Sequence, residues 1–150
     1  MIKIMFVCHG NICRSPMAEF IFKDLFAKTG RTIEFSVSSS ATSSEEIVNG
    51  KGMPIYHLAK IELAKHHISC DGKNAVQLKA KDYNYYDYFI CMDDYNIANA
   101  LKIFKGDPLN KVRKLQPNQN IFDPWYTGKF DLAFEQILTG CKLLLAEFEK

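Results

Sequence analysis

The 150-residue chain lacks the features that would place it in a membrane or among nucleic-acid-binding proteins. No apolar run approaches the roughly 20 residues of a membrane span, and residues 2–7 are too few for the hydrophobic core of a signal peptide. The formal net charge is only +2 and the basic residues are scattered, so we expect no nucleic-acid partner and no membrane partner. These absences predict a cytoplasmic protein and leave open a secretion route that needs no signal peptide.

Cysteine is scarce and follows neither a metal-site nor a disulfide pattern. The cysteines are odd in number, and only the first two lie close together in sequence: Cys8, Cys13, Cys70, Cys91 and Cys141. A dispersed, odd set favours free thiols over a disulfide framework. Neither paired Cys-x-x-Cys motifs nor a His/Cys ligand spacing occurs, so we expect no structural zinc.

The remaining composition is that of an ordinary globular protein. Hydrophobic residues make up 47% of the chain and charged residues 24%. A chain of this length buries a substantial core, and it contains no repeat, low-complexity tract or interdomain linker. We therefore predict a single domain over residues 1–150.

Strand-like and helix-like segments alternate along the chain. Short apolar runs predict strands over residues 3–7, 33–37, 85–92 and 111–115. Apolar residues at helical spacing predict helices over residues 16–28, 54–66, 94–104 and 130–148. Residues 38–52 show no apolar period and are predicted to form a long loop. The alternation indicates parallel βαβ units in an α/β fold, in which ligands bind at the carboxyl ends of the strands.

The most informative segment joins the first predicted strand to the first predicted helix. It reads Cys-His-Gly-Asn-Ile-Cys-Arg-Ser-Pro over residues 8–16. The Cys-x5-Arg spacing alone arises by chance in roughly one such chain in ten, so the context decides. Ser15 suits the N-cap and Pro16 the first helical position. Successive backbone N–H groups and the start of a helix favour a bound anion.

The side chains of this loop add a nucleophile to the anion site. Gly10 permits a close turn, and Asn11 tolerates a left-handed backbone. Arg14 offers a planar fork that grips two phosphate oxygens at once. The same positive field favours the thiolate form of Cys8. The loop is therefore predicted to bind a phosphate group with a sulfur directed at its phosphorus.

A second segment, residues 122–126, supplies a candidate acid. Asp123 follows the last predicted strand, and Pro124 makes the segment rigid. A thiolate that attacks phosphorus needs an acid for the departing oxygen and a base for the water that cleaves the thiophosphate. Asp123 suits both tasks. Trp125 and Tyr126 are predicted to form a wall of the pocket against which a flat substrate packs.

Residues 7–19, joined to Asp-Pro-Trp-Tyr at 123–126, resemble the low-molecular-weight protein tyrosine phosphatases. The likeness covers the whole chain, including Cys-Met-Asp at 91–93. It implies an α/β fold with a four-stranded parallel sheet and helices on both faces, a doubly wound, flavodoxin-like three-layer architecture. It also implies hydrolysis of phosphate monoesters, above all protein phosphotyrosine, through a phosphocysteine intermediate. No metal or other cofactor is implied.

The resemblance gives each motif residue an expected role. Cys8 is the nucleophile, Arg14 the phosphate clamp and Asp123 the general acid and base. The phosphate is expected to lie against the loop residues His9, Gly10, Asn11, Ile12, Cys13, Arg14 and Ser15. The loop is expected to be supported by Asn11, Ser15 and Ser39, with the Ser15 hydroxyl also stabilising the thiolate. Phosphotyrosine proteins or small aryl phosphates are the implied substrates, and phosphate-like oxyanions the implied inhibitors.

Other positions modify this expectation. Cys13 is expected to form a reversible disulfide with Cys8 that shields the nucleophile from irreversible oxidation. Residues 73–77, Lys-Asn-Ala-Val-Gln, stand where the family often has a stretch whose histidine braces the loop asparagine. The substitutions at Lys73 and Val76 leave the bracing unassigned. The substrate wall is expected to consist of Glu46, Trp125 and Tyr126.

Three alternative functions stay open. A thiol-dependent arsenate reductase shares this loop and fold, but it needs a further pair of closely spaced cysteines, and Cys70 and Cys91 are far apart in sequence. A phosphocysteine carrier resembles the start of the chain, but it typically has no equivalent of Arg14 and needs no Asp123. The third alternative is a phosphotyrosine-binding module without catalytic activity, which would not require Cys8, Arg14 and Asp123 all to be intact.

Overall fold

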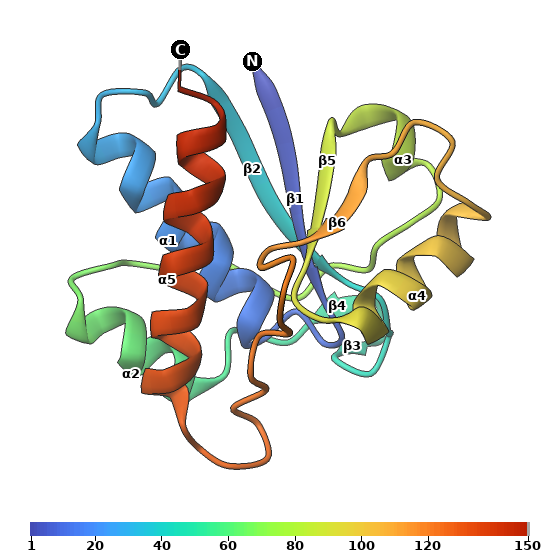
Figure 1. Ribbon diagram of the computed structural model, residues 1–150. Coiled ribbons are helices and arrows are strands. Elements are labelled where there is room, and N and C mark those ends of the chain that lie inside the picture. Colours follow the sequence, from blue (N-terminus) through green and yellow to red (C-terminus); the bar gives the residue numbers. More distant parts are fainter. Residues whose placement is uncertain (150) are drawn as a thin grey trace.

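The computed structural model describes residues 1–149 and has a parallel sheet at its centre (Figure 1). The strand order is β2-β1-β5-β6, and every neighbouring pair is parallel. These strands are β1 (Ile2–Cys8), β2 (Phe35–Ala41), β5 (Tyr88–Cys91) and β6 (Val112–Lys114). The predicted α/β fold with a four-stranded parallel sheet is confirmed.

The first strand was easy to recognise because it is buried on both faces. β1 pairs with β2 on one side and with β5 on the other. Ile4, Phe6 and Val7 are completely buried. A strand that is covered on both faces has a nearly continuous apolar sequence, as residues 4–7 do.

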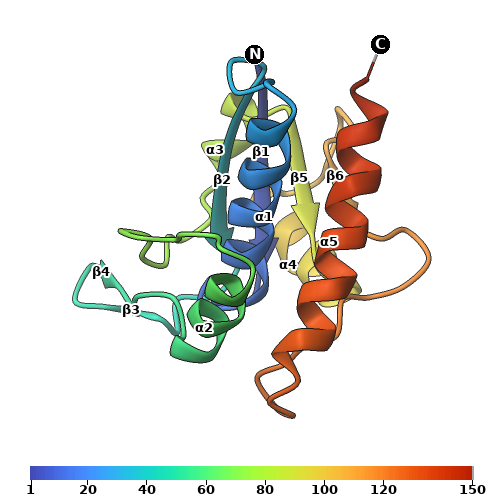
Figure 2. The same cartoon turned by 90° about the vertical axis from the view of Figure 1, so that its left-hand side faces the viewer.

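Helices cover both faces of the sheet, which completes the predicted three layers (Figures 1 and 2). On one side lie α1 (Arg14–Lys28), α2 (His57–Lys65) and α5 (Phe130–Glu147). On the other side lie α3 (Asp82–Tyr85) and α4 (Asp94–Phe104). Two apolar clusters fill the spaces between the layers, and β1 contributes Phe6 to one and Met5 to the other. Successive side chains of a strand point to opposite faces, so one strand supplies both clusters.

The second strand differs from the predicted residues 33–37. β2 begins at Phe35 and runs on through three serines to Ala41. Ile33 lies outside the strand and is 82% exposed. Residues 38–40 pair with residues 5–7 of β1, and Ser39 and Ser40 are buried there. The apolar pattern missed this half of β2 because its buried side chains are polar.

The predicted loop over residues 38–52 therefore starts later and contains a small hairpin. Its strands are β3 (Ile47–Val48) and β4 (Lys51–Gly52), which pair antiparallel. A side chain at Gly52 would place its Cβ 1.8 Å from the carbonyl oxygen of Ala75, so only glycine allows this close approach. The Val76 carbonyl in turn accepts a bond from the Ala41 N–H at 2.7 Å. Residues 75–76 are thus held between the hairpin and the end of β2.

The other elements differ from prediction mainly at their ends. The predicted helix 54–66 begins at His57, the helix 130–148 ends at Glu147, and the strand 111–115 shortens to β6. The predicted strand 85–92 begins only at Tyr88, because residues 82–85 form the short helix α3. Helix α4 matches its predicted bounds.

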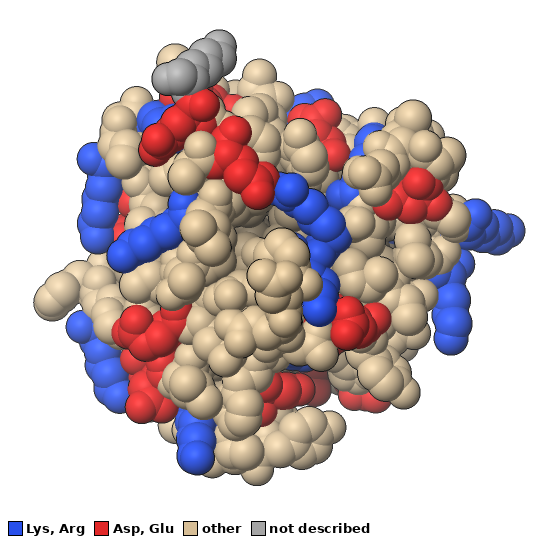
Figure 3. All heavy atoms as spheres, viewed as in Figure 1, with Lys and Arg blue, Asp and Glu red and all other residues tan. Residues whose placement is uncertain are grey.

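The molecular surface carries charges of both signs. On the face drawn in Figure 3, blue Lys and Arg side chains alternate with red Asp and Glu side chains. Within residues 1–149, no helix combines the length and the apolarity needed to cross a membrane.

Candidate active site

Residues 8–15 connect the carboxyl end of β1 to the first turn of α1. This edge of a parallel sheet is where ligand sites form. Asn11 has a φ of 59°, so its backbone is left-handed as predicted. Main-chain bonds from Thr42 N to the Cys8 carbonyl (2.9 Å) and from Ser43 N to the His9 carbonyl (3.0 Å) tie the loop to the segment after β2.

The side-chain amide of Asn11 braces the loop from inside. Its Oδ1 accepts a hydrogen bond from the Val76 N–H at 2.9 Å. Its Nδ2 donates to Ser15 Oγ at 2.8 Å and to Ser39 Oγ at 2.9 Å. A main-chain N–H can only donate, so the Val76 contact fixes which end of the amide carries the oxygen. The brace that the sequence left unassigned is therefore a backbone amide of residue 76.

The sulfur of Cys8 lies among hydrogen-bond donors. The N–H groups of Asn11 and Ser15 lie 3.3 and 3.4 Å from Sγ, and Ser15 Oγ lies 3.0 Å from it. Because Ser15 Oγ already accepts from the Asn11 amide, its own hydrogen is free to point to the sulfur. Donors gathered around a buried sulfur stabilise a negative charge there.

Ser15 is not the helix N-cap that the sequence predicted. Helix α1 begins at Arg14, and its N-cap Cys13 makes no side-chain capping bond. The Ser15 hydroxyl instead lies against the Cys8 sulfur. Pro16 occupies the first turn, where its missing N–H removes no helical hydrogen bond.

Behind the loop, Glu19 and Lys73 form a buried ion pair. Ser39 Oγ donates to Glu19 Oε1 at 2.6 Å. Lys73 Nζ donates to the Ser39 carbonyl at 2.9 Å and lies 3.8 Å from Glu19 Oε1. Burial lowers the pKa of Lys73 below its ordinary value, and the charge of Glu19 acts against that effect. Ser39 thus connects Lys73 to Asn11, because its carbonyl accepts from Lys73 and its hydroxyl accepts from the Asn11 amide.

Arg14 is buried and held in one orientation. Its Nη1 donates to Asp93 Oδ2 at 2.8 Å and to the Ile121 carbonyl at 3.0 Å. Two bonds use both hydrogens of Nη1, which leaves the hydrogens of Nε and Nη2 available to a ligand. Burial alone would lower the pKa of Arg14. The negative charges of Cys8, Asp123 and Asp93 outweigh it and raise the pKa, so the guanidinium stays charged.

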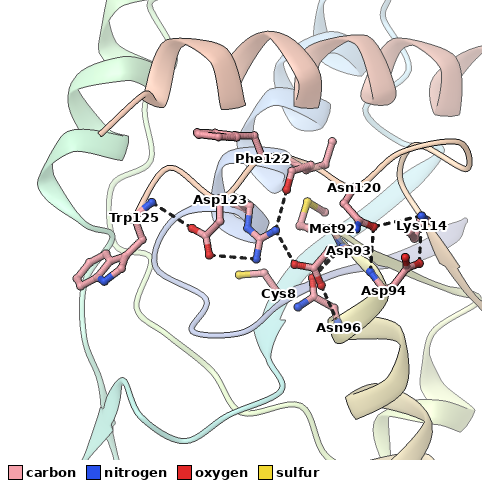
Figure 4. Close-up of polar contacts among 12 residues, drawn as sticks. Cys8, Met92, Asp93, Asp94, Asn96, Lys114, Asn120, Phe122, Asp123 and Trp125 are labelled. Atoms are coloured by element: carbon pink, nitrogen blue, oxygen red, sulfur yellow. Dashed lines mark hydrogen bonds and ion pairs between the residues drawn. The ribbon is translucent and has the colours of Figure 1, made fainter. Parts of the chain in front are cut away.

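Asp123 and Asp93 approach this guanidinium from opposite sides (Figure 4). Asp123 Oδ2 lies 3.6 Å from Arg14 Nη2, and its Oδ1 accepts from the Trp125 N–H at 3.1 Å. The Asp123 side chain is 37% exposed, which leaves it open to a substrate. Asp93 also caps helix α4, since its Oδ1 accepts from the Asn96 N–H at 2.8 Å. Asp93 thus connects the Arg14 guanidinium to the start of α4.

The loop and the Asp123 segment enclose one pocket. Its lining comprises Cys8, His9, Gly10, Asn11, Ile12, Cys13, Arg14, Glu45, Glu46, Asp123, Trp125 and Tyr126. The indole of Trp125 packs against Tyr56, with ring centroids 4.7 Å apart. Three predicted wall residues, Glu46, Trp125 and Tyr126, therefore reach the same space as the loop.

Two further predicted residues lie beneath the pocket rather than on its lining. Ser15 and Ser39 are buried and contact the pocket through Cys8 and Asn11.

His9 and the cysteines complete the description of the pocket. The His9 side chain lies 3.0 Å from the Glu45 carboxylate. Burial raises the pKa of the Cys13 thiol, and the charge of Cys8 adds to the effect. All five cysteines are free thiols in the structure.

Several supporting groups carried no signal in the sequence. Glu19 lies one helical turn beyond Ser15 and was given no role in the sequence analysis, yet it is buried. The Val76 N–H and the Ile121 carbonyl are backbone groups, which residue type does not reveal. Among residues 1–149, no group of three or more His, Cys, Asp or Glu side chains is arranged to hold a metal ion.

Comparison with known proteins places this geometry in a family. The family model described as low molecular weight phosphotyrosine protein phosphatase matches residues 3–150. The low molecular weight protein-tyrosine-phosphatase YfkJ of Bacillus subtilis is 36% identical, over 100% of this chain and 97% of that protein. The rat low molecular weight phosphotyrosine protein phosphatase is 30% identical, over 95% of this chain and 93% of that protein.

Solved structures agree with the sequence comparison. The crystal structure of YfkJ superimposes with a TM-score of 0.91, over 98% of this chain and 94% of that chain. A Streptococcus pyogenes low molecular weight protein tyrosine phosphatase gives 0.90 at 32% identity, over 100% and 95%. A Drosophila protein described as an arginine phosphatase gives 0.85 at 26% identity, over 99% of each chain. The chain belongs to the low-molecular-weight phosphotyrosine protein phosphatase family.

Proposed function

We propose that residues 1–150 form one phosphatase domain that hydrolyses phosphotyrosine in proteins, or small aryl phosphates, through a phosphocysteine intermediate on Cys8. The observation that carries this proposal is the set of three donors within 3.4 Å of the Cys8 sulfur. Hydrogen-bond donors in this arrangement can stabilise the negative charge of a thiolate, and they are in place before a substrate binds. Such preorganisation lowers the barrier because little has to rearrange during the reaction.

In the first step, the thiolate of Cys8 attacks phosphorus and forms an S–P bond. The P–O bond to the aromatic leaving group breaks at the same time. Asp123 in its acid form gives its proton to the leaving oxygen, which departs as a phenol. Proton transfer of this kind contributes roughly 10²- to 10⁴-fold in rate.

In the second step, the Asp123 carboxylate takes a proton from water, and the water oxygen attacks phosphorus. The S–P bond breaks, inorganic phosphate leaves and the Cys8 thiolate returns. Asp123 ends protonated, as the next turnover requires. The pairing of this acid with the Arg14 clamp is supported by their separation of 3.6 Å and by their shared pocket.

Arg14 is proposed to bind two phosphate oxygens through Nε and Nη2. Asp93 and the Ile121 carbonyl hold Nη1 and thereby orient the fork. Because this site recognises a tetrahedral oxyanion, free phosphate and its analogues are expected to compete with substrate. Trp125 and Tyr126 favour a flat aromatic leaving group on the exposed side of the pocket.

The test is hydrolysis of para-nitrophenyl phosphate by the wild-type protein and by Cys8→Ser. We expect turnover by the wild type and none by the variant. Cys70→Ser is the matched control, since Cys70 is also buried but does not line the pocket, and it should retain activity. Arsenate-dependent thiol oxidation without phosphate release would identify a reductase instead, and stable phosphorylation without turnover would identify a carrier. Faster release of phosphate from phosphoarginine than from phosphotyrosine would contradict the aryl preference.

A further inference from the structure

We propose that Glu45 and Glu46 form an acidic rim that directs the enzyme to phosphotyrosines flanked by Lys or Arg and away from those flanked by Asp or Glu. The proposal rests on phosphotyrosine hydrolysis at Cys8, as set out above. It adds the charge of the polypeptide around the phosphotyrosine as a determinant of substrate choice.

The acidic rim is fixed to the phosphate loop. Both residues lie between β2 and β3 and line the same pocket as Cys8. The Cγ of Glu46 lies 3.3 Å from the position that a Cβ on Gly10 would occupy, so its stem packs directly over the loop. The Met53 N–H donates to the Glu46 carbonyl at 2.8 Å and anchors the backbone there. Gly10 is thus the residue that makes room for a carboxylate at the pocket edge.

The charges that line the pocket are unbalanced. The lining contains the carboxylates of Glu45 and Glu46 and the Asp123 carboxyl, which is in its acid form when substrate binds; the cations are Arg14 and, when protonated, His9. Arg14 faces the phosphate and is already paired with Asp93, which is not part of the lining. His9 contacts Glu45 at 3.0 Å and offsets at most one carboxylate. The rim around a bound phosphotyrosine therefore stays negative.

The acidic and the aromatic side chains of the pocket also come from different segments of the chain. The acidic rim lies on the segment between β2 and the hairpin, whereas a second wall, on residues 123–126, presents the aromatic side chains of Trp125 and Tyr126. A peptide whose phosphotyrosine enters the pocket must pass both walls. Basic residues beside the phosphotyrosine would meet carboxylates on one wall and rings on the other, and both attract cations. Acidic residues there would be repelled.

The experiment compares two phosphotyrosine peptides that differ only in their flanking residues, Lys in one and Glu in the other. The enzymes are wild type, the double variant Glu45→Gln/Glu46→Gln, and Glu135→Gln, an exposed residue of α5 outside the pocket. An exposed ion pair changes affinity roughly 1.5- to fivefold. We therefore expect wild type and Glu135→Gln to prefer the Lys peptide about fivefold in kcat/KM, mostly through KM.

In the double variant the preference should fall below about twofold, and in wild type it should shrink at 0.5 M salt because exposed charges are screened. Hydrolysis of para-nitrophenyl phosphate, which has no flanking residues, should be the same for wild type and Glu135→Gln, and it gives the rate to which the two peptide rates of each enzyme are normalised. Equal turnover of both peptides by wild type, or a preference that survives in the double variant, would overturn the acidic rim alone. Absence of turnover of every aryl phosphate would overturn the proposed function together with it.

Discussion

The phosphate loop and the Asp123 segment form two walls of one pocket, yet they are built in opposite ways. In the loop, Asn11 and Ser15 are completely buried and the Arg14 side chain is only 5% exposed. Across the pocket, Trp125 is 49% exposed and Tyr126 is 84% exposed. The loop is braced by side chains of α1 and β2 and by the backbone amide of Val76. The Asp123 segment is held mainly by local bonds such as the one from Trp125 N to Asp123.

The two walls have different proposed tasks: the loop binds the phosphate group, and the Asp123 segment accepts the leaving group. A phosphate group has one shape and one charge, so a rigid set of donors suits every substrate. The leaving group varies, and an exposed wall accepts different aromatic and peptide neighbours. Substitutions in the loop should therefore reduce both activity and stability, whereas substitutions across the pocket should reduce activity alone.

The largest effect is expected for Arg14→Lys. Lysine lacks the fork that binds two phosphate oxygens, and it does not reproduce the bonds to Asp93 and the Ile121 carbonyl together. We expect kcat to fall roughly 10³-fold and the free energy of unfolding to fall by about 2 kcal/mol. Steady-state kinetics and urea unfolding measure the two effects. Loss of activity at full stability would show that the loop is less interlocked than its contacts indicate.

Asp123→Asn tests the exposed wall of the pocket, the Asp123 segment. Asparagine neither donates nor accepts the catalytic proton, so kcat should fall roughly 10²-fold. The free energy of unfolding should change by less than about 0.5 kcal/mol, because the side chain is partly exposed. The loss in kcat/KM, which reports the transfer of the phosphoryl group to Cys8, should be smaller for phenols that leave easily without a proton. A loss that is the same for good and poor leaving groups argues against the acid role.

A smaller effect is expected for Lys73→Met, which disturbs the loop from behind. The Ser39 carbonyl loses its bond from Lys73, and Glu19 keeps only Lys23 as a cationic partner. We expect kcat to fall roughly three- to tenfold and the free energy of unfolding to fall by about 1 kcal/mol. Lys23→Met is the matched control, since it removes the more exposed partner of the same carboxylate and should leave kcat near wild type. If both variants behave alike, Lys73 only stabilises the fold.

The same contrast explains what the sequence could predict. The placement of Cys8, Arg14 and Asp123 in one pocket could be predicted because the proposed chemistry depends on residue type, and β1 could be predicted because it is apolar except for Lys3. The second half of β2 was missed because its buried side chains include Ser39 and Ser40, which are polar; the Ser39 hydroxyl accepts from Asn11 and donates to Glu19. The Ser15 prediction failed for a related reason: a nearby sulfur competes for the hydroxyl that would cap the helix.

Tertiary contacts account for the remaining differences. The brace from Val76 is a backbone amide, and any residue except proline supplies one. Its place beside Asn11 follows from the close packing of Gly52 on Ala75, which joins segments distant in the chain. The start of β5 shifted because residues 82–85 form a helical turn, and Tyr85, 57% exposed, is a surface residue rather than part of the strand.

The most direct test of the account is detection of the phosphorylated sulfur. In Asp123→Asn, para-nitrophenyl phosphate should still transfer its phosphoryl group, because nitrophenolate leaves without a proton. The following hydrolysis lacks its base, so the intermediate should accumulate. Acid quenching followed by mass spectrometry of the peptide over residues 8–14 should find one phosphoryl group, and fragmentation should place it on Cys8. A phosphoryl group on His9, or none while turnover continues, would contradict the mechanism.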